Sequence, residues 1–123
     1  MILVLTALAG GLGGALRFLV DTGVQRGNRT SVPLGTIIVN ATACLVLGFV
    51  TAYASAHFGS GDVRSILGVG LLGGYSTFST ASVEALGLLR KGRWLAAIVH
   101  AGGMLVVCIG ASVLGLVAGA VIP

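Results

Sequence analysis

A run of hydroxyl and aromatic residues interrupts an apolar segment that is long enough to cross a bilayer. The run, GGYSTFST, covers residues 73–80. Hydrocarbon offers no hydrogen-bond partner, so each unsatisfied polar group there costs several kcal/mol. Breaks in membrane helices are tolerated where they line a cavity or bind something. This run is therefore expected to face protein, water or an ion.

The residue types in this run suit a small anion. Phe78 lies between Thr77 and Ser79. An aromatic ring has a positive edge, which can face a partly dehydrated anion while hydroxyl donors replace its lost water. Asn40, in the segment GTIIVN, places a carboxamide inside another apolar segment, where it must find partners. It either hydrogen-bonds a neighbouring helix or lines a conduction path.

Two charged residues flank these groups. Arg17 ends the first apolar segment, as a snorkelling anchor or as a fixed positive charge that attracts anions to a vestibule. Glu84 follows Thr80 by four residues. It is expected near a cytoplasmic mouth, either solvated or paired with Arg90 or Lys91. A direct role in anion entry requires this carboxylate to be protonated or paired.

Composition predicts an all-α membrane protein. The 123 residues are 56% hydrophobic and only 8% charged, whereas soluble chains carry about 25% charged residues. A spanning helix needs roughly 20 apolar residues. We expect one domain, 1–123, with spans at about 2–20, 33–57, 63–89 and 94–121, the third broken. A polar connection would cover 21–31, a turn 58–62 and a basic turn 90–93, and Pro33 suits a first helical turn.

Small and polar residues inside the spans have structural interpretations. Glycines four residues apart predict close helix packing; the pairs are Gly10 and Gly14, Gly70 and Gly74, and Gly115 and Gly119. Cys44 and Cys108 are expected to be buried, reduced thiols that pack as small apolar groups. His100 lies inside the fourth span and needs a partner there.

Basic residues predict how the chain inserts. Four spans place both termini on one side of the membrane. The opposite side would hold six basic residues, Arg17, Arg26, Arg29, Arg90, Lys91 and Arg93, against Arg64 on the terminal side. Positive residues favour the cytoplasmic side. Both termini are therefore expected to face outward in a multi-pass plasma-membrane protein. Basic residues at helix ends indicate orientation and lipid headgroups rather than nucleic acid.

Three motifs resemble those of the Fluc (CrcB-type) fluoride channels: GGLGGALR at 10–17, GTIIVN at 35–40 and GLLGGYSTFST at 70–80. The resemblance implies an antiparallel dimer that exports fluoride passively through two pores, without enzymatic activity. It implies fluoride pore or polar-track positions at Asn40, Phe78, Ser79 and Thr80, and conserved charged positions at Arg17 and Glu84. It also implies a central structural sodium ion (Na+) held by the backbone carbonyls of Gly73 and Ser76.

The chain departs from this family pattern at several positions. A second pore phenylalanine is replaced by Ala81, and a tyrosine and a serine of the fourth helix by His100 and Met104; Ser76 stands where threonine is usual. An antiparallel homodimer needs one sequence to insert both ways, which the charge bias opposes. We therefore hypothesise that this chain pairs with a different chain in a heterodimer. The outer surface of the dimer would contact membrane lipid.

Three other functions are compared with the same residues: a partner subunit, a drug exporter and an enzyme. A non-conducting partner subunit of a fluoride channel is consistent with the substitutions at Ala81, His100 and Met104. A small multidrug exporter would need an acidic residue in the first span, and about 2–20 contains none. A membrane enzyme would need a nucleophile with its base or a metal cluster, which the sequence does not suggest.

Overall fold

The computed structural model describes residues 1–59 and 61–123, and its regular elements are helices. They are α1 (Ile2–Gly27), α2 (Leu34–His57), α3 (Gly61–Val63), η1 (Arg64–Leu72), α4 (Gly73–Tyr75), α5 (Ser79–Arg90) and α6 (Trp94–Val121). Four stretches are long and apolar enough to cross a membrane: α1, α2, the composite Gly61–Arg90, and α6. The predicted all-α fold of four spans with a broken third span is confirmed.

The third span changes its helical character along its length. Residues Arg64–Leu72 form a π-helix, in which each N–H bonds a carbonyl five residues back rather than four. After Tyr75 the backbone leaves the helix, and Ser76 is extended with φ −72° and ψ 160°. Regular α-helix resumes at Ser79. The break therefore separates a wide, glycine-rich half-helix from a narrower one.

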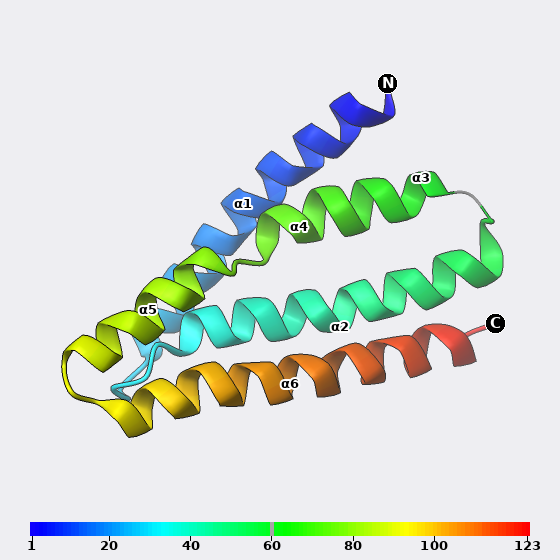
Figure 1. Cartoon of the computed structure of the whole chain (residues 1–123). Coiled ribbons are helices and arrows are strands. Elements are labelled where there is room, and N and C mark those ends of the chain that lie inside the picture. Colours follow the sequence, from blue (N-terminus) through cyan, green and yellow to red (C-terminus); the bar gives the residue numbers. More distant parts are fainter. Residues whose placement is uncertain (60) are drawn as a thin grey trace.

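The helices associate as two main pairs (Figure 1). α2 and α6 pack along each other, whereas α1 runs along η1 and α4. α5 contacts α6 beyond the break. Both termini lie at the same end as the last turn of α2 and the start of α3, and the other end holds the α1–α2 and α5–α6 connections (Figure 1). This arrangement brings the break in the third span against α1 on one side and α2 on the other.

Closely spaced glycines allow the helix pairs to approach. A Cβ on Gly74 would collide with the Gly10 carbonyl of α1, and a Cβ on Gly115 would collide with the Leu45 carbonyl of α2. A Cβ on Gly70 would lie 2.6 Å from the Thr6 carbonyl oxygen. The close helix packing predicted from the glycine spacing is therefore confirmed.

The first helix is longer than predicted. α1 continues to Gly27, so the expected polar connection at 21–31 is wrong, and the loop begins at Asn28. Arg17 lies ten residues before this end, about 15 Å along the axis, rather than at a loop. Pro33 is the N-cap of α2 rather than a residue of its first turn. Polar residues after Val20 extend the helix because a spanning helix can project into the headgroup region.

Most large apolar side chains face outward. The buried apolar residues are few and mostly small: Val39, Ala43, Ala54, Leu72, Leu88, Ala97 and Met104. In the apolar window of α1 only 6% of residues are buried. In a soluble protein such a surface would drive aggregation, so it must be covered by lipid or by another subunit.

A matched pair of alanine substitutions on α1 tests the packing. A Cβ on Gly13 would collide with the Leu71 carbonyl and lie 2.8 Å from the Tyr75 nitrogen, whereas a Cβ on Gly11 meets open space. We expect Gly13→Ala to destabilise the protein by about 1–3 kcal/mol, because helix backbones must separate. Gly11→Ala should be neutral or slightly stabilising. Thermal unfolding in detergent measures both, and equal melting temperatures would contradict the packing account.

Candidate functional site

One carboxamide satisfies the broken backbone of the third span. The Thr77 N–H donates to Asn40 Oδ1 at 2.8 Å, and Asn40 Nδ2 donates to the Thr77 carbonyl at 2.8 Å. In a continuous helix the Thr77 N–H would donate to the Gly73 carbonyl instead. The side chain of Asn40 therefore replaces the helical partners of Thr77 and fixes the break against α2.

The Thr77 side chain begins the second half-helix. Its hydroxyl oxygen accepts a hydrogen bond from the Thr80 N–H at 3.2 Å, which satisfies one of the free donors at the start of α5. The same hydroxyl donates to Thr80 Oγ1 at 3.1 Å and lies 3.4 Å from Ser79 Oγ. The Thr77, Ser79 and Thr80 hydroxyls thus form one cluster, and Thr77 is itself buried.

Arg17 reaches the break from α1. Its Nη1 donates to the Ser76 carbonyl at 3.3 Å. Together with Asp21, Thr36 and Thr80 it lines a cavity of about 170 Å³. Arg17 is therefore held by the protein at the break, and an interpretation as a simple lipid-facing anchor is wrong.

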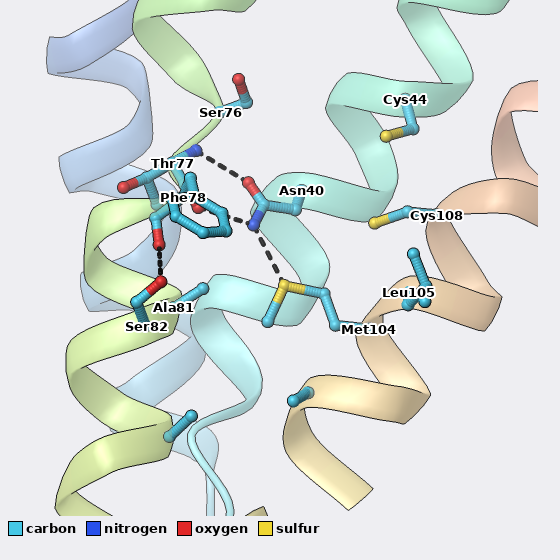
Figure 2. A pocket seen from close by; sticks show the side chains of 12 residues that line it. Asn40, Cys44, Ser76, Thr77, Phe78, Ala81, Ser82, Met104, Leu105 and Cys108 are labelled. Atoms are coloured by element: carbon cyan, nitrogen blue, oxygen red, sulfur yellow. Dashed lines mark hydrogen bonds between the residues drawn. The ribbon is translucent and has the colours of Figure 1, made fainter. Parts of the chain in front are cut away.

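A larger pocket of about 460 Å³ opens on the other side of the break (Figure 2). Asn40 and Phe78 line it, together with Ala81 and Met104. Asn40 Nδ2 also lies 3.1 Å from Met104 Sδ, which accepts a hydrogen bond from it. The Phe78 side chain is 87% exposed. The ring consequently stands at the open edge of the pocket.

The predicted pore residues divide between these spaces. Asn40 and Phe78 share the larger pocket. Thr80 lines the smaller cavity beside Arg17, and Ser79 lies at the Thr77 hydroxyl. Gly73 and Ser76 stand on either side of the helix end, with the Ser76 carbonyl bonded to Arg17. The break therefore separates two spaces rather than lining one.

Glu84 has different partners from those predicted. Its Oε1 accepts a hydrogen bond from Thr36 Oγ1 at 2.9 Å, and its Oε2 lies 3.4 Å from His100 Nε2. The expected pairing with Arg90 or Lys91 is therefore wrong. His100 is fully buried. Its Nε2 is close enough to Glu84 Oε2 for an ion pair, but the two atoms do not have the geometry of a hydrogen bond. Glu84 therefore lies against His100, but neither ring nitrogen of His100 has a hydrogen-bond partner among the described residues.

Sequence reasoning missed several residues of the site. Thr36 lies in the GTIIVN motif, but nothing in the sequence indicates its bond to Glu84. Tyr75 was recognised only as part of the polar run, and its hydroxyl lies 2.9 Å from Thr42 Oγ1 on α2. Cys44 and Cys108 line the larger pocket next to Asn40 (Figure 2). These pairings join different helices, which periodicity within one helix does not reveal.

Comparison with known proteins decides the family. Residues 4–116 match the family described as CrcB-like protein, Camphor Resistance (CrcB). The chain belongs to the CrcB-like family. The resemblance predicted from the three motifs is thereby confirmed, and residues 4–116 contain all of them.

Relatives in this family are similar over most of their length. The chain is 42% identical to fluoride-specific ion channel FluC 1 of Leifsonia xyli over 116 residues, 94% of this chain and 85% of the relative. It is 42% identical to fluoride-specific ion channel FluC 2 of Cutibacterium acnes over 121 residues, 97% and 98% of the two chains. It is 42% identical to FluC of Nitratidesulfovibrio vulgaris over 115 residues, 93% of each chain.

Replacing Asn40 tests how the break is held in this CrcB-like chain. Asn40→Leu has nearly the same shape but leaves the Thr77 N–H and carbonyl without partners. We expect a loss of about 2–4 kcal/mol, since a hydrogen bond contributes about 1 kcal/mol and an unsatisfied buried group costs about 1–3 kcal/mol. Thermal unfolding in detergent measures the loss.

The control for this substitution lies on the same helix. Ser55→Ala removes an exposed hydroxyl that donates to the Thr51 carbonyl at 2.7 Å, within α2 itself. It should cost less than about 1 kcal/mol. A melting temperature for Asn40→Leu equal to that of Ser55→Ala would show that the pairing with Thr77 does not hold the break.

Proposed function

We propose that this chain is a subunit of a fluoride-selective channel that lets fluoride leave the cytoplasm passively. The observation that supports this most directly is the reciprocal pairing of Asn40 with Thr77. It opens a membrane helix and places hydroxyl groups, an amide and the Phe78 ring around the opening. The relatives' names, fluoride-specific ion channel, agree with this proposal.

The local chemistry favours a small, strongly hydrated anion. The Ser79 and Thr80 hydroxyls supply donors that replace lost water, and the Phe78 ring edge supplies weak positive charge. Both Asn40 amide hydrogens are bonded, one to the Thr77 carbonyl and one to Met104 Sδ, so an anion would have to displace the weaker sulfur acceptor. The ion would then meet several weak partners rather than one strong cationic one. Conduction requires binding that is favourable enough for entry and weak enough for exit.

Fixed charges act near this route rather than within it. The Arg17 guanidinium is bonded to the Ser76 carbonyl and shares its cavity with Asp21, so it contributes a positive field that a neighbouring acidic group weakens. Glu84 would repel fluoride, but it is bound by Thr36 and lies beside His100. The Glu84 carboxylate is therefore held by neighbouring polar side chains rather than left free to face the ion.

The driving force requires no nucleotide. Hydrogen fluoride crosses membranes as a weak acid and dissociates in a less acidic cytoplasm, where fluoride accumulates. An inside-negative potential then drives the anion outward by about 2.3 kcal/mol per charge per 100 mV. A selective passive path would be enough to relieve fluoride toxicity.

A second subunit would complete the pathway. Phe78 is 87% exposed at the pocket edge, so a chain lying against it in the antiparallel sense would supply the facing wall. The remaining loop and helix-end charges are still biased, with Arg26, Arg29, Arg90, Lys91 and Arg93 at one end against Arg64 at the other. We therefore propose plasma-membrane insertion with both termini outside, and a heterodimer with a chain of opposite bias.

A non-conducting partner subunit is the second candidate. Ala81 and Met104 line the same pocket as Asn40 and Phe78. An alanine removes a ring wall and a thioether replaces a hydroxyl donor, which would weaken a fluoride path in this half of the dimer. In that case the chain would complete its partner's pore without conducting through its own.

Fluoride efflux from proteoliposomes tests the proposal, with chloride as the control ion. The chain is reconstituted alone and with a CrcB-like chain of opposite charge bias. We expect selective fluoride efflux with the partner, and at least a tenfold loss in Phe78→Leu because the ring edge is removed. Phe58→Leu, an exposed ring at the end of α2, should leave the rate unchanged.

Each outcome separates the hypotheses. Full fluoride efflux by the chain alone would restore the homodimer and exclude the requirement for a different partner. Efflux with the partner that is insensitive to Phe78→Leu would favour the non-conducting role. Equal passage of chloride, or no fluoride passage under any of these conditions, would overturn the channel proposal.

We also propose a structural sodium ion at the break. The Gly73 carbonyl loses its helical donor to Asn40, and the Ser76 carbonyl accepts only one bond from Arg17, although a carbonyl oxygen has two lone pairs. Oxygen donors suit a hard cation. One chain offers two carbonyls, so the donor set fits sodium only if a second subunit contributes its own pair.

Sodium removal tests this site through stability. Replacing Na+ by N-methylglucamine should lower the dimer's melting temperature, since a cation at about 100 times its Kd stabilises by about 2.7 kcal/mol. Arg17→Gln removes the positive charge beside the Ser76 carbonyl and should enlarge the sodium-dependent shift. A melting temperature independent of sodium in both proteins would rule out the ion.

A further inference from the structure

Three sulfur atoms gather in the larger pocket. Cys44 of α2 and Cys108 of α6 both line it, and their side chains lie on facing sides of the same space (Figure 2). Met104 lies one helical turn before Cys108 and lines the same pocket. Both thiols are half-buried and unbridged. The packing of α2 on α6 therefore brings two cysteines that are distant in the sequence into one pocket.

This donor set is selective for soft metal ions. Thiolate and thioether ligands prefer ions such as Cu(I), and a d10 monovalent ion accepts two thiolates. Zinc would require about four ligands, but the described residues contain no cluster of three or more His, Cys, Asp or Glu that could hold a metal. Hard cations prefer oxygen. A soft monovalent ion is the class that two thiols and a neighbouring thioether fit.

We propose that Cys44 and Cys108 bind a soft monovalent d10 cation, with the Met104 thioether beside it, and that the bound ion blocks the anion pathway. Each thiol loses one proton to water as its metal–sulfur bond forms, so two protons are released and no electron is transferred. Met104 Sδ already contacts the Asn40 amide at 3.1 Å. A metal at the dithiol would therefore draw on a group that touches the proposed fluoride site.

The blocking part of this proposal rests on the proposed fluoride conduction, whereas the binding part does not. The Cys44 and Cys108 side chains are the only thiols in the sequence, so binding to thiols can be assigned without a cysteine-free background. Silver ion, Ag+, is a suitable probe because it needs no reductant. Free thiols are titrated first, so that oxidised protein is counted separately.

Calorimetry in detergent and chloride-free buffer tests binding. We expect one Ag+ per chain for the natural protein, with a thiolate-to-silver absorption band in the ultraviolet and release of two protons. Cys44→Ser and Cys108→Ser should each weaken binding at least tenfold, because either change leaves only one thiolate. Equal Ag+ affinity in either single variant and the natural protein would overturn the dithiol site, whether or not the chain conducts fluoride.

Fluoride efflux tests the block separately. In nitrate medium, Ag+ should reduce efflux at least tenfold for the natural chain with its partner, and less than twofold for the Cys44→Ser/Cys108→Ser double variant, each measured against its own silver-free rate. One-to-one binding with undiminished efflux would overturn the block. Equal inhibition of the double variant would place the inhibitory ion elsewhere and overturn it too.

Discussion

The structure depends on how the interrupted backbone of the third span is satisfied inside the membrane. A break exposes peptide groups that hydrocarbon does not solvate. Here a single side chain, Asn40, supplies both an acceptor and a donor to Thr77 at 2.8 Å each. Serine or threonine at position 40 would offer a single hydroxyl hydrogen and a shorter reach. The carboxamide is therefore matched to the peptide that it replaces.

Arg17 and Glu84 have hydrogen-bonded partners around this break, whereas Asp21 Oδ1 is buried without one among the described residues. Arg17 bonds the Ser76 carbonyl, and Asp21 lines the same small cavity one turn further along α1. Glu84 is held by Thr36 and lies beside the buried His100. Leaving one member of such a pair unpartnered would be costly. Fixed charges of both signs also give a weaker local field than Arg17 alone, which favours passage of an anion over its capture.

The sequence was sufficient for the features that composition and local patterns determine. Apolar length predicted four spans, hydroxyl residues predicted the break, and glycine spacing predicted close helix packing, which the structure shows where Gly74 meets Gly10. It was insufficient for pairings between helices. Glu84 was expected to be solvated or paired with nearby Arg90 or Lys91, but it contacts Thr36 of α2 and His100 of α6. Likewise, nothing in the spacing of Cys44 and Cys108 shows that α2 and α6 bring them together.

The larger pocket is open on one side because of how the broken backbone is satisfied. A break that is satisfied from α1 and α2 leaves the Phe78 ring on the side that neither helix covers, where it is 87% exposed. Covering that side with another helix of the same chain would fill the pocket with apolar side chains. Covering it with a second subunit brings a second polar break toward the first. Because Asn40 and Arg17 bond the backbone of the break, the Phe78 ring remains available to a second subunit in the proposed dimer, whose own side chains would then face Ala81.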